Sequence, residues 1–182
     1  MKCKNFFKTM TAAICAASLL MAGCGSDKAA DDTIKIGAIG EMTGGNASYG
    51  TSMMRGFKLA VKEINASGGV NGKKLVLVEA DTKSEPAEAA NAMSKLINQD
   101  KVPMVAGIFT SSSAIAACNI SETAKIPYLA IGATNPSVTL AKDGSTKPNT
   151  FRVCFIDPFQ GTKMADYAFN KMGAKTAAVI YQ

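Results

Sequence analysis

Four consecutive hydroxyl residues precede an apolar segment with helical spacing, a position in which hydroxyl groups can bind an anion. They occupy residues 110–113, in the segment GIFTSSSA. At the start of a helix several backbone N–H groups lack partners, and the helix dipole adds about 0.3–1 kcal/mol to the binding of a negative charge. The run is therefore a candidate site for a carboxylate. A single serine that caps the helix would also explain it.

A second polar segment, GATNPS at residues 132–137, follows another apolar run. Gly132 permits close approach of the backbone, Thr134 supplies a hydroxyl group, and Asn135-Pro136 favours a turn. On composition alone this is only a loop. Beside the hydroxyl run it would form the second wall of a small polar pocket, in which each hydrogen bond to a charged group contributes about 1.5–3 kcal/mol.

The segment GEMTGGNASYGTS, residues 40–52, raises the question of phosphate binding. Gly45 and Gly50 have the glycine spacing of a phosphate-binding loop and Thr51 follows, but the lysine that such a loop needs is absent. The sequence contains no histidine, which excludes Ser-His-Asp and Cys-His catalysis and most zinc sites. We therefore predict a protein that is not an enzyme and has no catalytic residue, metal or cofactor. A nucleotide-using enzyme is the weaker alternative.

The elements that must position these loops alternate along the chain. Strands are expected in TIKIGAIG, KKLVLVEAD, PMVAGIF, IPYLAIG, FRVCFI and TAAVIY, and helices over residues 51–66, 86–99, 112–123 and 157–173. This alternation predicts the α/β class, with a doubly wound parallel sheet covered on both faces. Ligands bind such sheets beyond the carboxyl ends of the strands, which selects the loops at residues 41–50, 81–85, 110–113 and 132–136.

The amino terminus has the pattern of a targeting segment. Lysines at the start are followed by an apolar stretch too short to span a bilayer, and the segment ends in LLMAGCGSD. It resembles a bacterial lipoprotein signal, which implies that residues 1–23 are removed and that Cys24 is lipidated. The polar residues 24–32 would then be a linker that tethers the domain to the outside of the cytoplasmic membrane. An ordinary signal peptide is the alternative.

Charge and cysteine content follow from that interpretation. The net charge of +6 includes three lysines of the targeting segment, and the remaining charges form no run, so no nucleic-acid partner is predicted. Of five cysteines, Cys118 and Cys154 stay in the domain. One is expected on an apolar helix face and the other within a strand. Two buried thiols are therefore favoured over a disulfide.

The ordered set of loops resembles a known family. The segments IKIGAIGEMTGGNASYG, GGVNGKKLVLVEAD, GIFTSSS, IPYLAIGATNPSVT and FRVCFID look like the amino-terminal part of the branched-chain amino-acid (leucine/isoleucine/valine) binding proteins of ABC transporters. That family has a two-lobed clamshell fold of the periplasmic binding protein type I. The resemblance runs from about Thr33 to the last residue.

The resemblance implies roles for four residues. Ser111 would bind the α-carboxylate of an amino acid through its hydroxyl, and Gly132 would offer backbone groups to its ammonium and carboxylate. Thr134 would add a hydroxyl to the carboxylate. Tyr49, expected in the loop before the first helix, would form an aromatic wall against the ligand side chain, with a solvent-facing turn residue as the alternative. Some relatives carry a disulfide at positions matching Ser84 and Thr110, which this chain lacks.

The resemblance also implies how the chain is organised. Residues 33–152 would form lobe 1 of the ligand-binding domain and residues 153–182 the start of lobe 2, with Phe151-Arg152 at the first crossing. The chain ends in an apolar run, so we expect a fragment truncated early in lobe 2 that is unable to bind its ligand fully. The expected function is delivery of Leu, Ile, Val or a related small amino acid or amide to an ABC permease. The alternative is the ligand-sensing ectodomain of a signalling receptor with the same fold.

Overall fold

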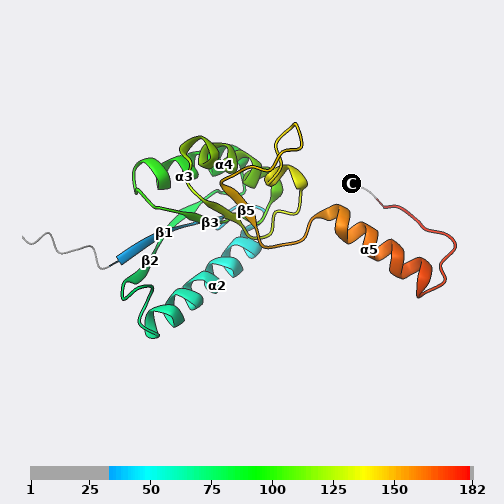
Figure 1. Cartoon of the computed structure of the whole chain (residues 1–182), viewed down its shortest axis with the longest axis horizontal. Coiled ribbons are helices and arrows are strands. Elements are labelled where there is room, and N and C mark those ends of the chain that lie inside the picture. Colours follow the sequence, from blue (N-terminus) through cyan, green and yellow to red (C-terminus); the bar gives the residue numbers. More distant parts are fainter. Residues whose placement is uncertain (1–32, 181–182) are drawn as a thin grey trace, which may run out of the picture. The chain divides into compact units, whose positions relative to one another are not determined.

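The computed structural model describes residues 33–180, so the predicted signal segment 1–23 and the linker 24–32 with Cys24 lie outside the described residues. A five-stranded parallel sheet with the order β2-β1-β3-β4-β5 forms the centre of the fold (Figure 1). Its strands are β1 (Thr33–Gly40), β2 (Lys74–Asp81), β3 (Val105–Gly107), β4 (Tyr128–Ala130) and β5 (Thr150–Arg152). The predicted fold class, α/β with a parallel sheet, is confirmed.

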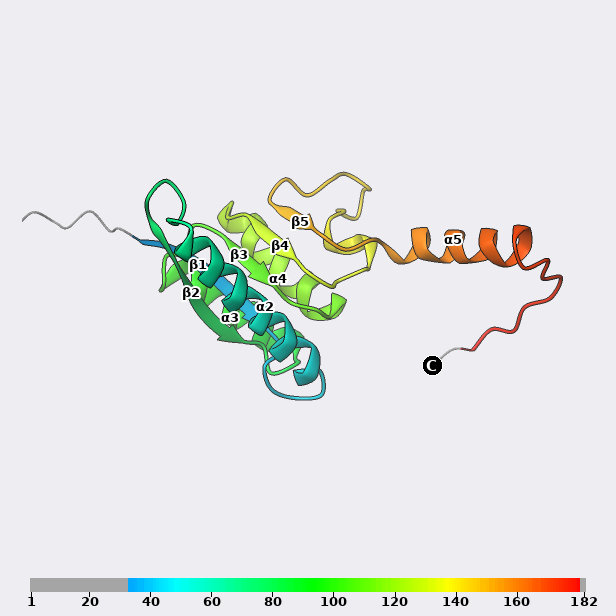
Figure 2. The ribbon, with the colours of Figure 1, turned by 90° about the horizontal axis from the view of Figure 1, so that it is seen from below.

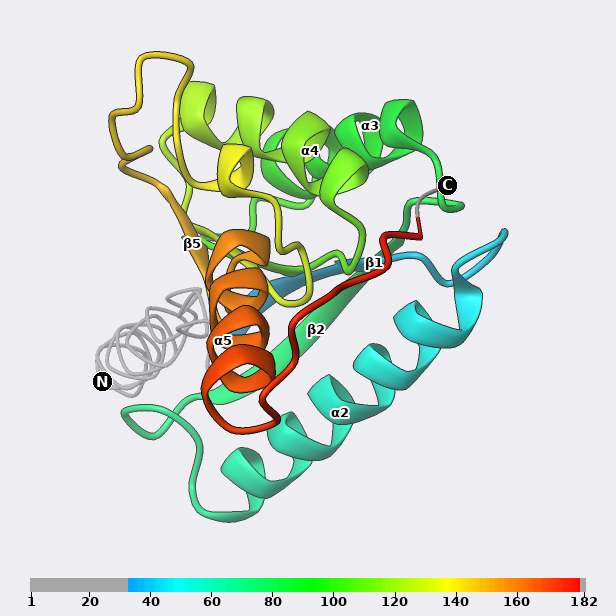
Figure 3. The same ribbon diagram turned by 90° about the vertical axis from the view of Figure 1, so that its right-hand side faces the viewer.

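Helices cover both faces of the sheet. The covering helices are α2 (Ala47–Ala66), α3 (Pro86–Asn98) and α4 (Ser111–Ala124). The chain also forms a short 3-10 helix beside α4, η1 (Pro136–Val138), and a helix after the sheet, α5 (Asp157–Asn170). Helices α3 and α4 lie side by side on one face and α2 lies on the other, as Figures 2 and 3 show from two directions. This two-sided cover is what a doubly wound sheet requires, because its strands are apolar on both faces.

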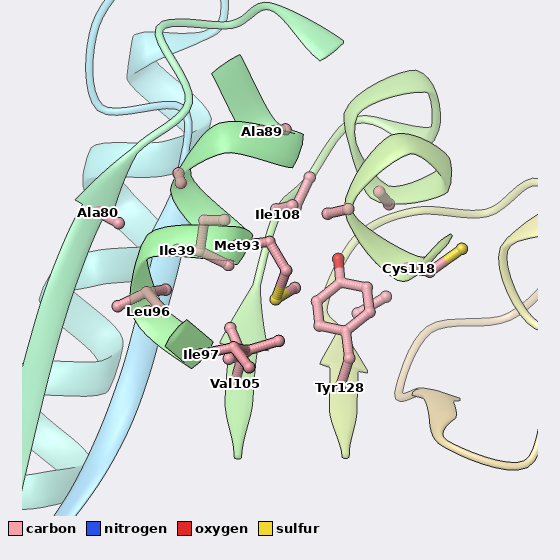
Figure 4. Close-up of a cluster of buried hydrophobic side chains, with 14 of the residues drawn as sticks. Ile39, Ala80, Ala89, Met93, Leu96, Ile97, Val105, Ile108, Cys118 and Tyr128 are labelled. Atoms are coloured by element: carbon pink, nitrogen blue, oxygen red, sulfur yellow. The ribbon is translucent and has the colours of Figure 1, made fainter. Parts of the chain in front are cut away.

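The core lies between the sheet and the pair α3 and α4 (Figure 4). Met93 and Leu96 of α3 and Tyr128 of β4 have no exposed surface. Full burial of an apolar side chain of this size contributes about 1.5–3 kcal/mol. The Tyr128 hydroxyl donates a hydrogen bond to the Gly107 carbonyl, 3.3 Å away, so its one polar group has a partner inside the core.

Helix α2 differs from the prediction at its start. It begins at Ala47, four residues before the expected position, so Tyr49 lies in the first turn of the helix rather than in a loop. Gly44 and Gly45 stand before the helix, where glycine does not weaken it, whereas Gly50 and Gly56 lie inside it. Gly50 lies directly against the backbone of Glu41, because a Cβ added at Gly50 would be only 2.8 Å from the backbone nitrogen of Glu41. This contact joins α2 to the end of β1.

The carboxyl-terminal part departs most from the prediction. The expected strand TAAVIY is absent, since residues 173–180 form no helix or strand. Strand β5 ends at Arg152, so Cys154 lies outside it and is half-buried rather than buried. Cys118 is buried as predicted, and both thiols are free. No residue of α5 is buried.

Candidate functional site

The hydroxyl run and the Gly-Thr loop lie at one edge of the sheet. Strands β3 and β4 pair directly, with Gly107 opposite Ala130, so the loops that follow them begin at the same level. The backbone N–H of Asn135 donates a hydrogen bond to the Ser111 hydroxyl oxygen, 3.2 Å away. Ser111, Gly132 and Thr134 are all half-buried, neither sunk in the core nor fully exposed. The structure therefore brings together three of the four predicted site residues.

The start of α4 is not explained by a serine cap. The N-cap residue is Thr110, and it makes no capping hydrogen bond with its side chain. Ser111 is the first helical residue, Ser112 is exposed and Ser113 is buried. The Ser113 hydroxyl has no hydrogen-bond partner among the described residues. The first turn of α4 thus combines the positive end of the helix dipole with hydroxyl groups, an arrangement that suits an anion.

Glu41, directly after β1, is a fully buried carboxylate at this edge. It accepts hydrogen bonds from the backbone N–H groups of Phe109 at 3.0 Å and Thr110 at 2.9 Å, and from the Thr110 hydroxyl at 2.7 Å. A buried charge is tolerated only when hydrogen bonds replace its lost water, and these three supply that replacement. Sequence reasoning gave Glu41 no role.

The backbone after β3 is bent so that it meets Glu41. Gly107 has φ 139° and Ile108 has φ 57°, and the latter value is uncommon for a β-branched residue. A Cβ at Gly107 would overlap the carbonyl group of Ile39. Residues in such conformations cost of order 1–3 kcal/mol and persist where the surroundings hold them. The buried Ile108 side chain and the Glu41 hydrogen bonds are those surroundings.

Tyr49 and Phe109 form an aromatic pair at the same edge. Their rings are stacked with centroids 4.5 Å apart and planes 9° from parallel. Beside the pair is an open apolar hollow of about 660 Å³ along α2. It is lined by Ser48, Tyr49, Ser52, Met53, Gly56, Phe57, Phe109 and Ile131. Of the four predicted residues only Tyr49 lines this hollow, so the predicted polar residues and the apolar wall belong to adjoining regions.

Gly132 has a packing reason to be glycine. A Cβ at this position would lie 2.6 Å from Cε2 and 2.8 Å from Cγ of the Phe109 ring. The loop after β4 therefore packs closely against this ring. Gly132 thereby links the polar loop to the aromatic pair.

Two more charged residues hold the neighbouring loops. Asp81, at the end of β2, accepts hydrogen bonds from the N–H groups of Met42, Thr43 and Lys83 and from the Thr43 hydroxyl, the last at 2.6 Å. Burial alone would raise the pKa of Asp81, but these hydrogen bonds together lower it below its ordinary value of 3.8. Asp81 therefore stays ionised and fixes the loop after β1.

Arg152, at the end of β5, holds the Gly-Thr loop from the other side. Its guanidinium donates to the carbonyl groups of Ala133 at 3.0 Å and Asn135 at 2.8 Å, and to the Thr139 hydroxyl at 2.8 Å. The N–H of Asp157 donates to the Thr134 carbonyl, 3.3 Å away. The backbone of this loop is thus tied to the segment that leaves the sheet.

Glu41, Phe109 and Arg152 are the residues at this edge that sequence reasoning missed. No local signal in the sequence marked Glu41, and Arg152 lies inside the expected strand FRVCFI as the last residue of β5. Within residues 33–180 no three His, Cys, Asp or Glu side chains are close enough to hold a metal ion. No helix in that range is long and apolar enough to cross a membrane.

Comparisons with known proteins agree on one family. A family model described as periplasmic binding protein matches residues 33–182. The chain is 39% identical over 178 residues to an amino acid binding protein of Pseudomonas aeruginosa, covering 98% of this chain and 46% of that protein. It is 33% identical over 178 residues to the leucine-specific-binding protein of Salmonella typhimurium, covering 98% of this chain and 45% of that one.

A solved structure matches both the sequence and the fold. The branched-chain amino acid transporter substrate binding protein of Streptococcus pneumoniae, in complex with isoleucine, superposes with a TM-score of 0.71 at 40% identity. The superposition covers 79% of this chain and 40% of that chain. The chain therefore spans less than half of the length of the proteins it matches.

Proposed function

Because the chain belongs to the periplasmic binding protein family, we propose that it carries one half of the ligand site of an extracytoplasmic solute-binding protein. The proposed ligand is leucine, isoleucine, valine or a related small amino acid or amide. The site is the edge of the sheet at which Ser111, Gly132 and Thr134 lie, together with the adjoining wall that contains Tyr49. The role is binding and delivery, without a bond being made or broken.

One observation carries this proposal: the hydrogen bond between the N–H of Asn135 and the Ser111 hydroxyl, which joins the start of α4 to the loop after β4. A carboxylate at this junction would meet a helix N-terminus and the hydroxyls of Ser111 and Thr134. Charge-assisted hydrogen bonds of this kind contribute about 1.5–3 kcal/mol each. They would hold the end that all amino acids share.

The adjoining aromatic pair supports an apolar side chain on the ligand. Tyr49 is 52% exposed and Phe109 is 37% exposed, so both rings keep free surface although they stack on each other. An apolar group placed against them would be shielded from water, at about 25 cal/mol for each Å² that it buries. A charged side chain would find no opposite charge on that wall.

The proposal also covers the lobes of the protein, its partner and its membrane anchor. We infer that residues 33–152 form lobe 1 and residues 153–182 begin lobe 2, with an ABC permease as the partner that receives the solute. Residues 1–23 would be a lipoprotein signal peptide and Cys24 the lipidated residue, anchoring the protein outside the cytoplasmic membrane. The LLMAGCGSD pattern supports the anchor, and the family supports the location.

A pair of adjacent serine variants tests the site. In the complete two-lobed protein, Ser111→Ala should weaken isoleucine binding by about 1–3 kcal/mol, because it removes a hydroxyl from the proposed carboxylate site. Ser112→Ala, one residue along the same turn but exposed, is the matched control and should leave the affinity unchanged. Binding is measured by calorimetry or by NMR titration with leucine, isoleucine, valine and lysine. Equal affinities for all four amino acids, or equal losses in the two variants, would contradict the assignment.

A further inference from the structure

We propose that Glu41 is the positioning residue of this site, which means that its carboxylate fixes both the hydroxyl end and the aromatic wall without touching the ligand. The inference rests on the proposed function. Glu41 has no exposed surface, so it cannot contact a solute directly. Its carboxylate instead binds the backbone of Phe109 and Thr110, the two residues that immediately precede Ser111.

Glu41 fixes the direction of the chain between β3 and α4. Ile108 is held at φ 57°, and this bend presents two successive N–H groups to one carboxylate. Glu41 accepts from both partly buried N–H groups, so removal of its charge weakens both hydrogen bonds. The bend would then lose its compensation and relax. Since Ser111 follows Ile108 by three residues, its hydroxyl would move with the bend.

Glu41 also fixes the aromatic wall formed by Tyr49 and Phe109. The Phe109 ring stacks on Tyr49 and lies against Gly132. Its backbone is fixed by Glu41, and Gly50 of α2 lies directly against the backbone of Glu41. One buried carboxylate thus sets the position of α4, of the Phe109 ring and of the helix that carries Tyr49.

The chain contains a matched carboxylate elsewhere. Glu122 of α4 also accepts three hydrogen bonds, from the N–H and side-chain amide of Asn149 and from the Thr150 hydroxyl at 2.6 Å. Its partners lie at the start of β5, whereas Glu41 acts at the carboxyl ends of the strands. The same change in both residues therefore separates a general loss of stability from a loss of site geometry.

The experiment compares Glu41→Gln with Glu122→Gln in the protein. Glutamine keeps the size of the side chain but removes the charge and replaces one acceptor oxygen by a donor. Urea denaturation measures stability, and NMR measures the contacts between the Tyr49 and Phe109 rings and the affinity for isoleucine. We expect both variants to lose stability. We expect Glu41→Gln alone to lose the ring contacts and to bind isoleucine about tenfold more weakly, which corresponds to about 1.4 kcal/mol.

Each outcome decides the inference. If Glu41→Gln retains the ring contacts and the affinity, or if Glu122→Gln weakens binding equally, Glu41 is only a structural carboxylate and the inference is wrong. If the unmodified protein does not respond to any amino acid, the proposed function fails instead. In that case the ring contacts still decide the role of Glu41, because they are measured without ligand. Their loss in Glu41→Gln alone supports positioning, and their retention overturns it.

Discussion

Replacement of Gly132 by alanine should disturb the site through a single steric contact. The added Cβ would lie 2.6 and 2.8 Å from two carbons of the Phe109 ring, closer than real Cβ atoms come to their neighbours. The φ angle of Gly132 lies outside the left-handed region, so alanine would meet no backbone strain there. The whole effect should therefore come from the ring.

The size of the effect follows from where the ring can go. Phe109 cannot keep its place against both Gly132 and Tyr49, so it must move and give up the stacked geometry. An aromatic pair of this kind contributes about 0.5–1.5 kcal/mol beyond the burial of its surface. Inserting a methyl group into a packed position costs about 1–3 kcal/mol. Because the ring is partly exposed and can move outward, we expect a total loss of about 1–3 kcal/mol in the free energy of unfolding.

A double-mutant cycle isolates this contact. Gly132→Ala is made in the natural sequence and in a Phe109→Ala background, and stability is measured by urea denaturation. In the Phe109→Ala background the clash is absent, so Gly132→Ala should cost close to nothing and the coupling energy should equal the original loss. Gly45→Ala is the control, since a Cβ there would have no neighbour within 4 Å. An unchanged cost of Gly132→Ala without the Phe109 ring would refute the reasoning.

Two further predictions concern titration and reactivity. Because the folded state lowers the pKa of Asp81, this carboxylate contributes stability that is complete above pH 3.8 and is lost as the pH falls through the lower pKa of the folded state. Asp81→Asn should therefore flatten the loss of stability measured by urea denaturation between about pH 5 and pH 2. Parallel curves of stability against pH for the variant and the natural sequence would contradict this. Burial raises the pKa of the Cys118 thiol more than the hydrogen bond from Lys147, with Nζ and Sγ 3.2 Å apart, lowers it. Since the thiolate is the reactive form, iodoacetamide should modify Cys154 before Cys118 in peptide mass spectra, and the reverse order would show that Cys118 is accessible.

The strands and the edge of the sheet were predictable because their signals are local. The run TIKIGAIG has no helical spacing, and β1 occupies those residues. A parallel sheet then places every following loop at one edge, so Ser111 and the loop at Thr134 had to be neighbours once β3 and β4 paired. Local signals also explain one error. TAAVIY is apolar enough for a strand, but a strand exists only when another strand pairs with it.

Glu41 was missed because its partners are distant in the sequence. Phe109 and Thr110 lie 68 and 69 residues away, and nothing in the segment GEM indicates that the side chain turns inward. Tyr49 was placed in a loop because the glycines before it were given too much weight. The role of Glu41 depends on which backbone N–H groups the fold leaves without a backbone acceptor. Sequence spacing does not contain that information.

Charged side chains connect most neighbouring loops at this edge of the sheet. Asp81 connects the loops after β2 and β1, Glu41 those after β1 and β3, and Arg152 the end of β5 to the loop after β4. Between the loops after β3 and β4, the side-chain hydrogen bond found among residues 33–180 is the neutral one from Asn135 to Ser111. Hydrogen bonds to charged groups are about twice as strong as neutral ones, so the side-chain link at this junction is the weakest of the four. A ligand carboxylate bound there would supply the missing charge, which gives a physical reason for the site to lie at this junction.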